Sequence, residues 1–246
     1  MLVKQAANVV ELLEYFSRRR RPATLAEISD DLEWPRSSTF NLVGTLAERG
    51  YLYEPRPRYG YYPSPRWLSV LQKVGEAEPL PQTVLSLLAE IAAETEETTA
   101  ISSVSGTNAI FLHVVESKQP IRYFAQIGTR VPIHASSAGR ALLAQMTLKE
   151  RETFYRKITF ISYSPTTPMS IDAIEAELRN AAERGYHQSN SEFIPDLAGV
   201  ACPLLLGTRN LSVVVAGPVS RCLERRPAIA EIITRAILRF GLGNSE

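Results

Sequence analysis

Cysteine and histidine are scarce in this chain, which has two cysteines and three histidines among its 246 residues. Cys202 and Cys222 match no metal-binding spacing, so we expect reduced thiols rather than a disulfide scaffold. No apolar run approaches the roughly 18 residues of a membrane span. Residues 1–7 lack the apolar block of a signal peptide. These absences predict a soluble, cytoplasmic protein with no membrane partner.

The chain also lacks the motifs of common enzyme classes. It has no Gly-x-Ser-x-Gly sequence and no phosphate-binding glycine loop, and His113, His134 and His187 are far apart with no adjacent nucleophile. We therefore predict no catalytic residue, no cofactor and no metal. A zinc site built from His134, Cys202 and a second histidine is an alternative, but scattered ligands favour a loop histidine bonded to the backbone.

Residues 1–50 instead have the pattern of three helices. Apolar residues recur at three- and four-residue steps along the first helix and predict one buried face: Val3, Ala7, Val10, Leu13 and Phe16. Thr24 and Glu27 match a capping box, in which each side chain satisfies a free backbone donor of the other residue, so a second helix begins at Thr24. Pro35 separates this helix from a third, which runs to about Arg49.

A tyrosine-rich hairpin follows the third helix. Residues 51–53 and 59–62 have the β-propensity of two short strands, and Pro55–Arg58 is a turn that continues neither strand. Helices followed by such a hairpin are typical of a winged helix-turn-helix, whose recognition helix lies in the DNA major groove. We expect Arg56 and Arg58 at the tip of the wing to reach the DNA backbone or an adjacent minor groove.

The polar first turns of the third helix carry the side chains that we expect to read DNA. The net charge is only +1, so the placement of basic residues is more informative than their sum. Arginine can bind guanine and asparagine can bind adenine through two hydrogen bonds, whereas short hydroxyls and helix N-termini bind phosphates. The serines and the threonine have an alternative role, which is only to cap and solubilise the helix. The predicted contacts to double-stranded DNA are Thr24, Arg36, Ser37, Ser38, Thr39, Asn41, Arg56 and Arg58.

Prolines mark the expected division of the chain. A helix predicted from about residue 65 to 74 is followed by a proline-bearing break at 75–81. We therefore expect a winged helix-turn-helix domain at residues 1–64, a helical linker at 65–80 and a second domain at 81–246.

The second domain mixes strands and helices without regular alternation. Strand-like segments lie at 99–104, 109–115, 121–126, 200–206 and 211–216. Helical patterns lie at 81–95, 136–146, 148–155, 171–184 and 228–240. This order predicts the α+β class with a mainly antiparallel sheet.

Three segments carry a resemblance to a known family. Residues 128–144, Gly-Thr-Arg-Val-Pro-Ile-His-Ala-Ser-Ser-Ala-Gly-Arg-Ala-Leu-Leu-Ala, are similar to the signature block of the IclR family of bacterial transcriptional regulators. Residues 184–203 resemble the family's ligand loop and following strand, and residues 216–221 its last sheet strand and turn. The resemblance implies that the helical linker joins the winged helix-turn-helix domain to a sensor domain of GAF-like architecture. It further implies dimers or tetramers on partly palindromic promoter sites, and a small organic acid as effector.

Carried over position by position, the resemblance implies an effector pocket lined by Ser137, Ala138, Ser189, Gly199, Val214 and Ala216. The backbone amides of the first two would face an anion. Family members that bind small keto acids have an acidic residue at position 189, a thiol at 199 and hydroxyls at 214 and 216. A small polar ligand would leave its groups unpaired in the more apolar pocket of this chain, at roughly 1–3 kcal/mol each. We therefore expect an effector with an apolar or aromatic body.

Two further points qualify this interpretation. Asn41 stands where the family commonly has an arginine, which alters the expected operator sequence rather than DNA binding itself. The alternative function is a regulator that binds DNA constitutively and whose sensor answers to a protein partner or to oxidation at Cys202. The apolar neighbours of Cys202 favour an inert core thiol over this alternative.

Overall fold

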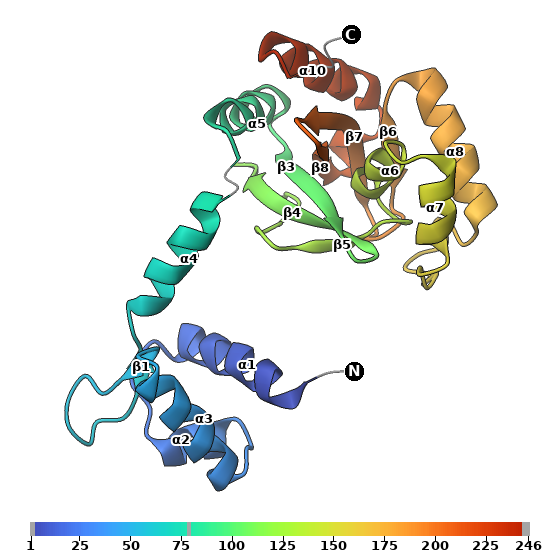
Figure 1. The fold of residues 1–246 in the computed structure, drawn as a ribbon. Helices are drawn as coiled ribbons and strands as arrows, with labels where there is room; N and C mark the ends of the chain where they lie inside the picture. The colour runs from blue at the N-terminus through green and yellow to red at the C-terminus, as the bar shows by residue number, and fades with distance from the viewer. Residues whose placement is uncertain (1–2, 78–79, 243–246) are drawn as a thin grey trace. The chain divides into compact units, whose positions relative to one another are not determined.

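A computed structural model describes residues 3–77 and 80–242 of the chain. The chain folds as two units, Met1–Pro79 and Leu80–Glu246 (Figure 1). The first unit is helical with a small hairpin and the second contains a six-stranded sheet with helices, so the predicted α+β class is confirmed. Within the described residues, no helix is long and apolar enough to cross a membrane. The linker role predicted for residues 65–80 stays a prediction.

The first unit, here called the head, has the element order of a winged helix-turn-helix. Its elements are α1 (Lys4–Arg19), α2 (Leu25–Asp31), α3 (Arg36–Glu48), β1 (Leu52–Tyr53), β2 (Tyr62–Pro63) and α4 (Arg66–Ala77). One apolar core joins α1, α2, α3 and the hairpin through Leu12, Phe16, Ile28, Val43 and Leu52. The predicted capping box is present, since the Thr24 amide donates to Glu27 Oε2 at 2.9 Å and the Glu27 amide donates to Thr24 Oγ1 at 3.3 Å.

The face predicted for the first helix is confirmed at Phe16 but wrong at Val3 and Val10. Leu12, Tyr15 and Phe16 are buried, whereas the side chains of Val3 and Val10 are 58% and 56% exposed. Two neighbouring apolar stripes run along this helix, and both satisfy the three- and four-residue spacing. The pattern therefore predicts the helix correctly but cannot choose between the stripes.

The second unit, here called the sensor domain, is built on one fully antiparallel sheet in the order β5-β4-β3-β8-β7-β6. Its strands are β3 (Thr98–Ser105), β4 (Asn108–Val115), β5 (Arg130–Pro132), β6 (His187–Asn190), β7 (Leu197–Leu206) and β8 (Arg209–Pro218). The helices are α5 (Gln82–Thr95), α6 (Ser137–Leu143), α7 (Leu148–Tyr155), α8 (Ile171–Arg184), α9 (Val219–Cys222) and α10 (Arg226–Arg239).

The sheet separates two apolar cores. Helices α5 and α10 pack together on one face, where Val213 and Val215 of β8 lie in the same core as Leu87 and Ile233 (Figure 1). Helix α6 packs on the other face, and there Val214 shares a core with Leu142. Successive residues of β8 therefore point to opposite faces, as a strand buried on both sides requires.

The strand predicted at residues 121–126 is absent. The carbonyl of Tyr123 accepts a hydrogen bond from Thr98 Oγ1 at 2.6 Å, and the carbonyl of Ile121 accepts one from Arg221 at 2.8 Å. Because side chains satisfy these carbonyls, the segment runs as a loop. The edge position beside β4 is taken by the short strand β5, which the sequence pattern missed together with β6.

Candidate functional site

The exposed face of α3 carries most of the predicted DNA contacts. Arg36, Ser37, Ser38 and Asn41 are all exposed in its first two turns. The sequence analysis missed Phe40, whose side chain is 64% exposed between them. An exposed aromatic ring beside arginine and asparagine suits contact with a thymine methyl group. The sequence pattern gave no sign of this exposure, because apolar helix residues usually face a core.

Two of the predicted DNA contacts, Thr39 and Thr24, use their hydroxyls in hydrogen bonds within the head. Thr39 is fully buried and its hydroxyl donates to the carbonyl of Pro35 at 3.2 Å, so the expectation that it faces DNA freely is wrong. It lies on the same side of α3 as the buried Val43, one helical turn later, and Leu46, two turns later. Thr24 is half-buried and uses its hydroxyl in the capping box.

The tip of the wing is exposed and basic. Arg56 and Arg58 both lie in the turn between β1 and β2. The guanidinium of Arg56 lies 5.7 Å from the centre of the Tyr59 ring, a distance at which a cation and an aromatic face attract. Arg58 has a φ of 63°, in the left-handed region that tight turns use.

All six residues predicted to form the effector pocket line one cavity in the sensor domain. The volume of this cavity is about 40 Å³. Three aromatic side chains that the sequence analysis did not place also line it: Phe111, Tyr123 and Phe193. The rings of Phe111 and Tyr123 meet edge to face at 6.5 Å. Phe193 is far along the chain from Phe111 and Tyr123, so no local pattern could have assembled the three.

Gly199 brings two hydroxyls together in this cavity. A Cβ atom at Gly199 would lie 2.6 Å from Ser137 Oγ and 2.8 Å from Ser189 Oγ. The missing side chain therefore leaves the space that these two hydroxyls occupy. Hydroxyls that converge beside an apolar and aromatic wall are suited to hold one polar group of a ligand.

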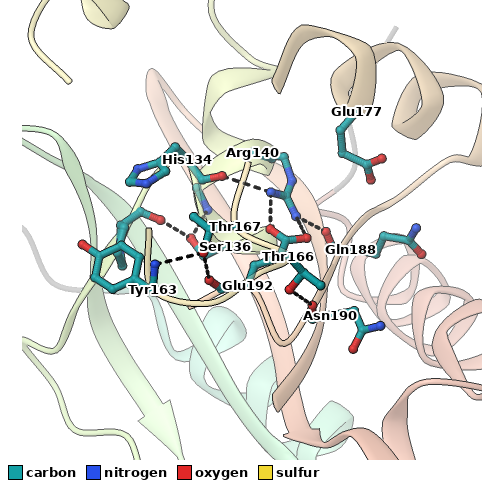
Figure 2. A network of polar contacts seen from close by, with 12 residues as sticks. His134, Ser136, Arg140, Tyr163, Thr166, Thr167, Glu177, Gln188, Asn190 and Glu192 are labelled. Carbon is teal, nitrogen blue, oxygen red and sulfur yellow. Dashed lines mark hydrogen bonds and ion pairs between the residues drawn. The ribbon is translucent and has the colours of Figure 1, made fainter. Parts of the chain in front are cut away.

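A buried arginine lies at the centre of a network of polar contacts beside the cavity (Figure 2). Arg140 of α6 is completely buried, and its guanidinium binds both carboxylate oxygens of Glu192 at 2.6 and 3.0 Å. The same group donates to the carbonyl of His134 at 3.1 Å and to that of Gln188. Glu192 lies in the segment that joins β6 to β7 and lines the cavity. A lone arginine in a sequence gives no sign of such burial.

Models of two protein families match the chain. The model of the bacterial transcriptional regulator IclR C-terminal domain matches residues 72–239, and the model of the IclR helix-turn-helix domain matches residues 5–56. The first match alone spans more than half of the 246 residues. The chain belongs to the IclR family. It is therefore a transcriptional regulator with a DNA-binding head and an effector-binding C-terminal domain.

Known IclR-family proteins are similar to this chain along nearly its whole length. The HTH-type transcriptional repressor AllR of Salmonella paratyphi A is 27% identical over 223 residues, which cover 88% of this chain and 80% of AllR. The Thermotoga maritima IclR structure has a TM-score of 0.80 at 18% identity and covers 98% of this chain and 99% of its own. An IclR homologue from Microbacterium hydrocarbonoxydans in complex with 4-hydroxybenzoate has a TM-score of 0.74 at 23% identity, covering 96% and 97%.

Both cysteines of this IclR-family chain are buried free thiols. Burial raises the pKa of Cys202 to about 11. Burial, together with the carboxylate of Glu97, raises the pKa of Cys222 to about 12. The thiolate is the reactive form, so both environments disfavour reaction near neutral pH. Within residues 3–77 and 80–242, no three His, Cys, Asp or Glu side chains are grouped as metal ligands would be.

Two histidines of the sensor domain are buried in their neutral form. Burial lowers the pKa of His134, whose Nε2 lies 3.1 Å from the carbonyl oxygen of Ile161. Burial and the charges of Arg140 and Arg184 lower the pKa of His187 from 6.5 to about 4. In the unfolded chain both imidazoles have the ordinary pKa of histidine.

We expect the sensor domain to lose stability as the pH falls from 7 to 5. The unfolded chain takes up the proton of His187 below about pH 6.5, whereas the folded chain takes it up only near pH 4. Protonation therefore favours unfolding in this window, by roughly 2 kcal/mol for His187. Urea unfolding at several pH values measures the slope of the free energy of unfolding against pH, and His187→Gln should flatten this slope. A variant that keeps the full slope of the wild type would contradict the assignment.

Proposed function

We propose that this regulator binds promoter DNA through α3 and the wing, and that a small organic acid with an apolar or aromatic body binds in the sensor cavity and changes that affinity. The cavity is the observation that carries the proposal. Six positions implied by the family resemblance and three aromatic side chains line the same space. We infer that the protein acts by binding, without catalysis, in the bacterial cytoplasm where its DNA lies.

The head supports the DNA part of the proposal. Arg36 and Asn41 are both exposed in the first two turns of α3, and each carries a side chain that can bind base edges in the major groove. Ser37 and Ser38 can contact phosphates near the N-terminus of α3, whereas the hydroxyl of Thr24 is used in the capping box. The wing arginines add two positive charges that suit the backbone or an adjacent minor groove.

A partly palindromic site requires two heads, so we propose a dimer or a tetramer as the active form. Two heads on one face of the duplex would contact half-sites about 34–36 Å apart, or a multiple of this distance. An effector that shifts the placement of the heads needs only about 1–3 kcal/mol of coupling to change promoter occupancy.

The cavity lining supports an aromatic acid over a keto acid. Val214 and Ala216 contribute no hydrogen-bonding group from their side chains, whereas Phe111, Tyr123 and Phe193 offer ring surfaces. The hydroxyls of Ser137 and Ser189 and the amides of residues 137 and 138 are the groups proposed to hold the carboxylate. The Microbacterium homologue, whose fold is similar to that of this chain, is in complex with the aromatic acid 4-hydroxybenzoate, which supports this choice.

A panel of acids tests the proposal through thermal stability of the purified protein. We expect benzoate and its ring-substituted relatives to raise the unfolding temperature more than glyoxylate or pyruvate does. At 100 times its dissociation constant, a ligand stabilises the folded state by about 2.7 kcal/mol. Stronger stabilisation by glyoxylate or pyruvate would contradict the aromatic assignment. A sensor that responds to none of these acids would favour the alternative of a protein partner.

Gly199→Ala should weaken benzoate binding about 10-fold. The added methyl group takes the space of the Ser137 and Ser189 hydroxyls and turns them away from the ligand, at the cost of about one hydrogen bond. Calorimetric titration of both proteins measures the change. Gly75→Ala is the control, because a Cβ at Gly75 meets no atom within 4 Å. Equal benzoate affinity of Gly199→Ala and the wild type would place the carboxylate elsewhere.

A further inference from the structure

The segment from Asn190 to Leu197, here called the cavity loop, forms one wall of the sensor cavity. Glu192, Phe193 and Ile194 in its middle and Leu197 at its end all line the cavity. The loop is closed on itself, since the Ser191 amide donates to the carbonyl of Leu197 at 2.8 Å and the Leu197 amide donates to that of Ile194 at 3.3 Å. The position of Glu192 therefore determines where the ring of Phe193 meets a ligand.

The buried guanidinium of Arg140 fixes this loop from the side of α6. Its two Nη atoms bind the two carboxylate oxygens of Glu192, in the paired geometry that gives arginine its directional strength. Both Nη atoms also donate to carbonyls, one of His134 and one of Gln188, so the group is held in a single orientation. The first turn of the same helix also provides Ser137 and Ala138 to the lining of the cavity.

A second segment, residues 163–167, fixes the loop from the other side (Figure 2). Thr167 Oγ1 donates to the carbonyl of Glu192 at 2.6 Å while it accepts from the amides of Tyr163 and Ser164 at 3.1 and 3.0 Å. Thr166 Oγ1 donates to the carbonyl of Asn190 at 3.0 Å. The ring of Tyr163 meets that of Phe193 edge to face at 5.0 Å. Thr167 is 7% exposed, so water cannot easily replace its hydroxyl.

We propose that Arg140, Glu192 and Thr167 are the positioning residues of the effector cavity. None of the three is needed as a ligand contact. They hold the cavity loop so that Phe193 and Leu197 form the wall against which an aromatic ring packs. Both sets of contacts meet at Glu192, because Arg140 binds its carboxylate and Thr167 donates a hydrogen bond to its backbone carbonyl. The consequence for ligand binding rests on the proposed function, whereas the effect on the loop itself does not.

Hydrogen exchange of the full-length protein, followed by mass spectrometry, tests the effect on the loop directly. Thr167→Val keeps the shape of the side chain and removes the hydroxyl, and Glu192→Gln keeps the shape and removes the charge. In both variants we expect the amides of Ser191 and Leu197 to exchange about 10-fold faster than in the wild type, as for the loss of one hydrogen bond. Thr167→Ser should restore slow exchange. The amides of Leu204 and Leu211, which are partner residues in β7 and β8, should be unaffected in Thr167→Val.

Glu175→Gln is the matched control, because Glu175 forms a similar partly buried ion pair with Arg151 in the same domain. This variant should lower the unfolding temperature without faster exchange in the cavity loop. Equal loop exchange in the wild type, Thr167→Val and Glu192→Gln would overturn the inference. Faster exchange throughout the sensor domain in Thr167→Val would overturn it as well, because the Thr167 hydroxyl would then be merely structural.

Calorimetric titration with benzoate separates this inference from the proposed function. If the wild type binds benzoate, Thr167→Val should bind it about 10-fold more weakly and Thr167→Ser about as well as the wild type. Unchanged benzoate affinity in Thr167→Val would overturn the positioning role. A wild type that binds no benzoate would contradict the proposed effector class, and the exchange of the loop amides would then decide the inference alone.

Discussion

Arg140→Met is expected to destabilise the sensor domain by about 3–5 kcal/mol, because it leaves a buried carboxylate without its partner. Arg140 is completely buried and the side chain of Glu192 is only 14% exposed. The substitution also removes the donors to the carbonyls of His134 and Gln188. Methionine fills similar space without charge. The loss of stability therefore measures the electrostatic and hydrogen-bonding role of Arg140 rather than the effect of an empty cavity.

Urea unfolding followed by far-UV circular dichroism measures this effect. Arg235→Met is the control, since Arg235 and Glu94 form an ion pair with side chains 55% and 43% exposed. Exposed pairs contribute about 0–1 kcal/mol, so the control should unfold nearly as the wild type does. The double variant Arg140→Met with Glu192→Leu should recover part of the loss, because no unpaired charge remains. An Arg140→Met protein as stable as the control would contradict the account.

Gly60→Ala is expected to destabilise the head by about 3 kcal/mol or more and to abolish DNA binding. A Cβ at Gly60 would lie 2.4–2.6 Å from backbone atoms of Ala23 and Thr24, which cannot move aside as a flexible side chain can. Gly60 also has a φ of 96°, which other residues rarely adopt. Strain from overpacking and from a left-handed backbone each cost about 1–3 kcal/mol. The adjacent bridge between Ala23 and Tyr61 ties the wing to the helices.

Tryptophan fluorescence reports on the head alone, because both tryptophans, Trp34 and Trp67, lie in it. Gly50→Ala is the matched control, with a φ of 75° but no atom closer than 3.7 Å to its Cβ. We expect that control to lose about 1–2 kcal/mol and to keep its affinity for DNA. If the two variants unfolded at the same urea concentration, close backbone contact at Gly60 would not be what holds the wing.

The sequence predicts the features that depend on local chemistry. The capping box of Thr24 and Glu27, the break at Pro35 and the tyrosine-rich hairpin each act within a few residues, and together they indicate a winged helix-turn-helix. The buried face of α1 could not be predicted in the same way, because two apolar stripes fit one spacing. Thr39 was misplaced for a related reason, since its polarity suggested exposure while its helical position turns it inward.

The cavity required information from beyond the local pattern. Its six predicted residues came from a family resemblance, and they do line one space. The aromatic wall joins Phe111 to Phe193, and the ion pair joins Arg140 to Glu192, which are 52 positions apart. Such contacts depend on the order of the strands in the sheet, which no periodicity in the sequence specifies.

Selective DNA binding by the α3 face is the central claim, and comparison of variants on a selected duplex tests it most directly. Duplexes that the full-length protein enriches from fragments of its own genome would be titrated across a salt series with the wild type, Arg36→Ala and Asn41→Ala. We predict enrichment of a partly palindromic sequence, a steep loss of affinity with salt, and a loss of about 1–3 kcal/mol in each variant. No enriched sequence, or affinity indifferent to both substitutions, would contradict the account.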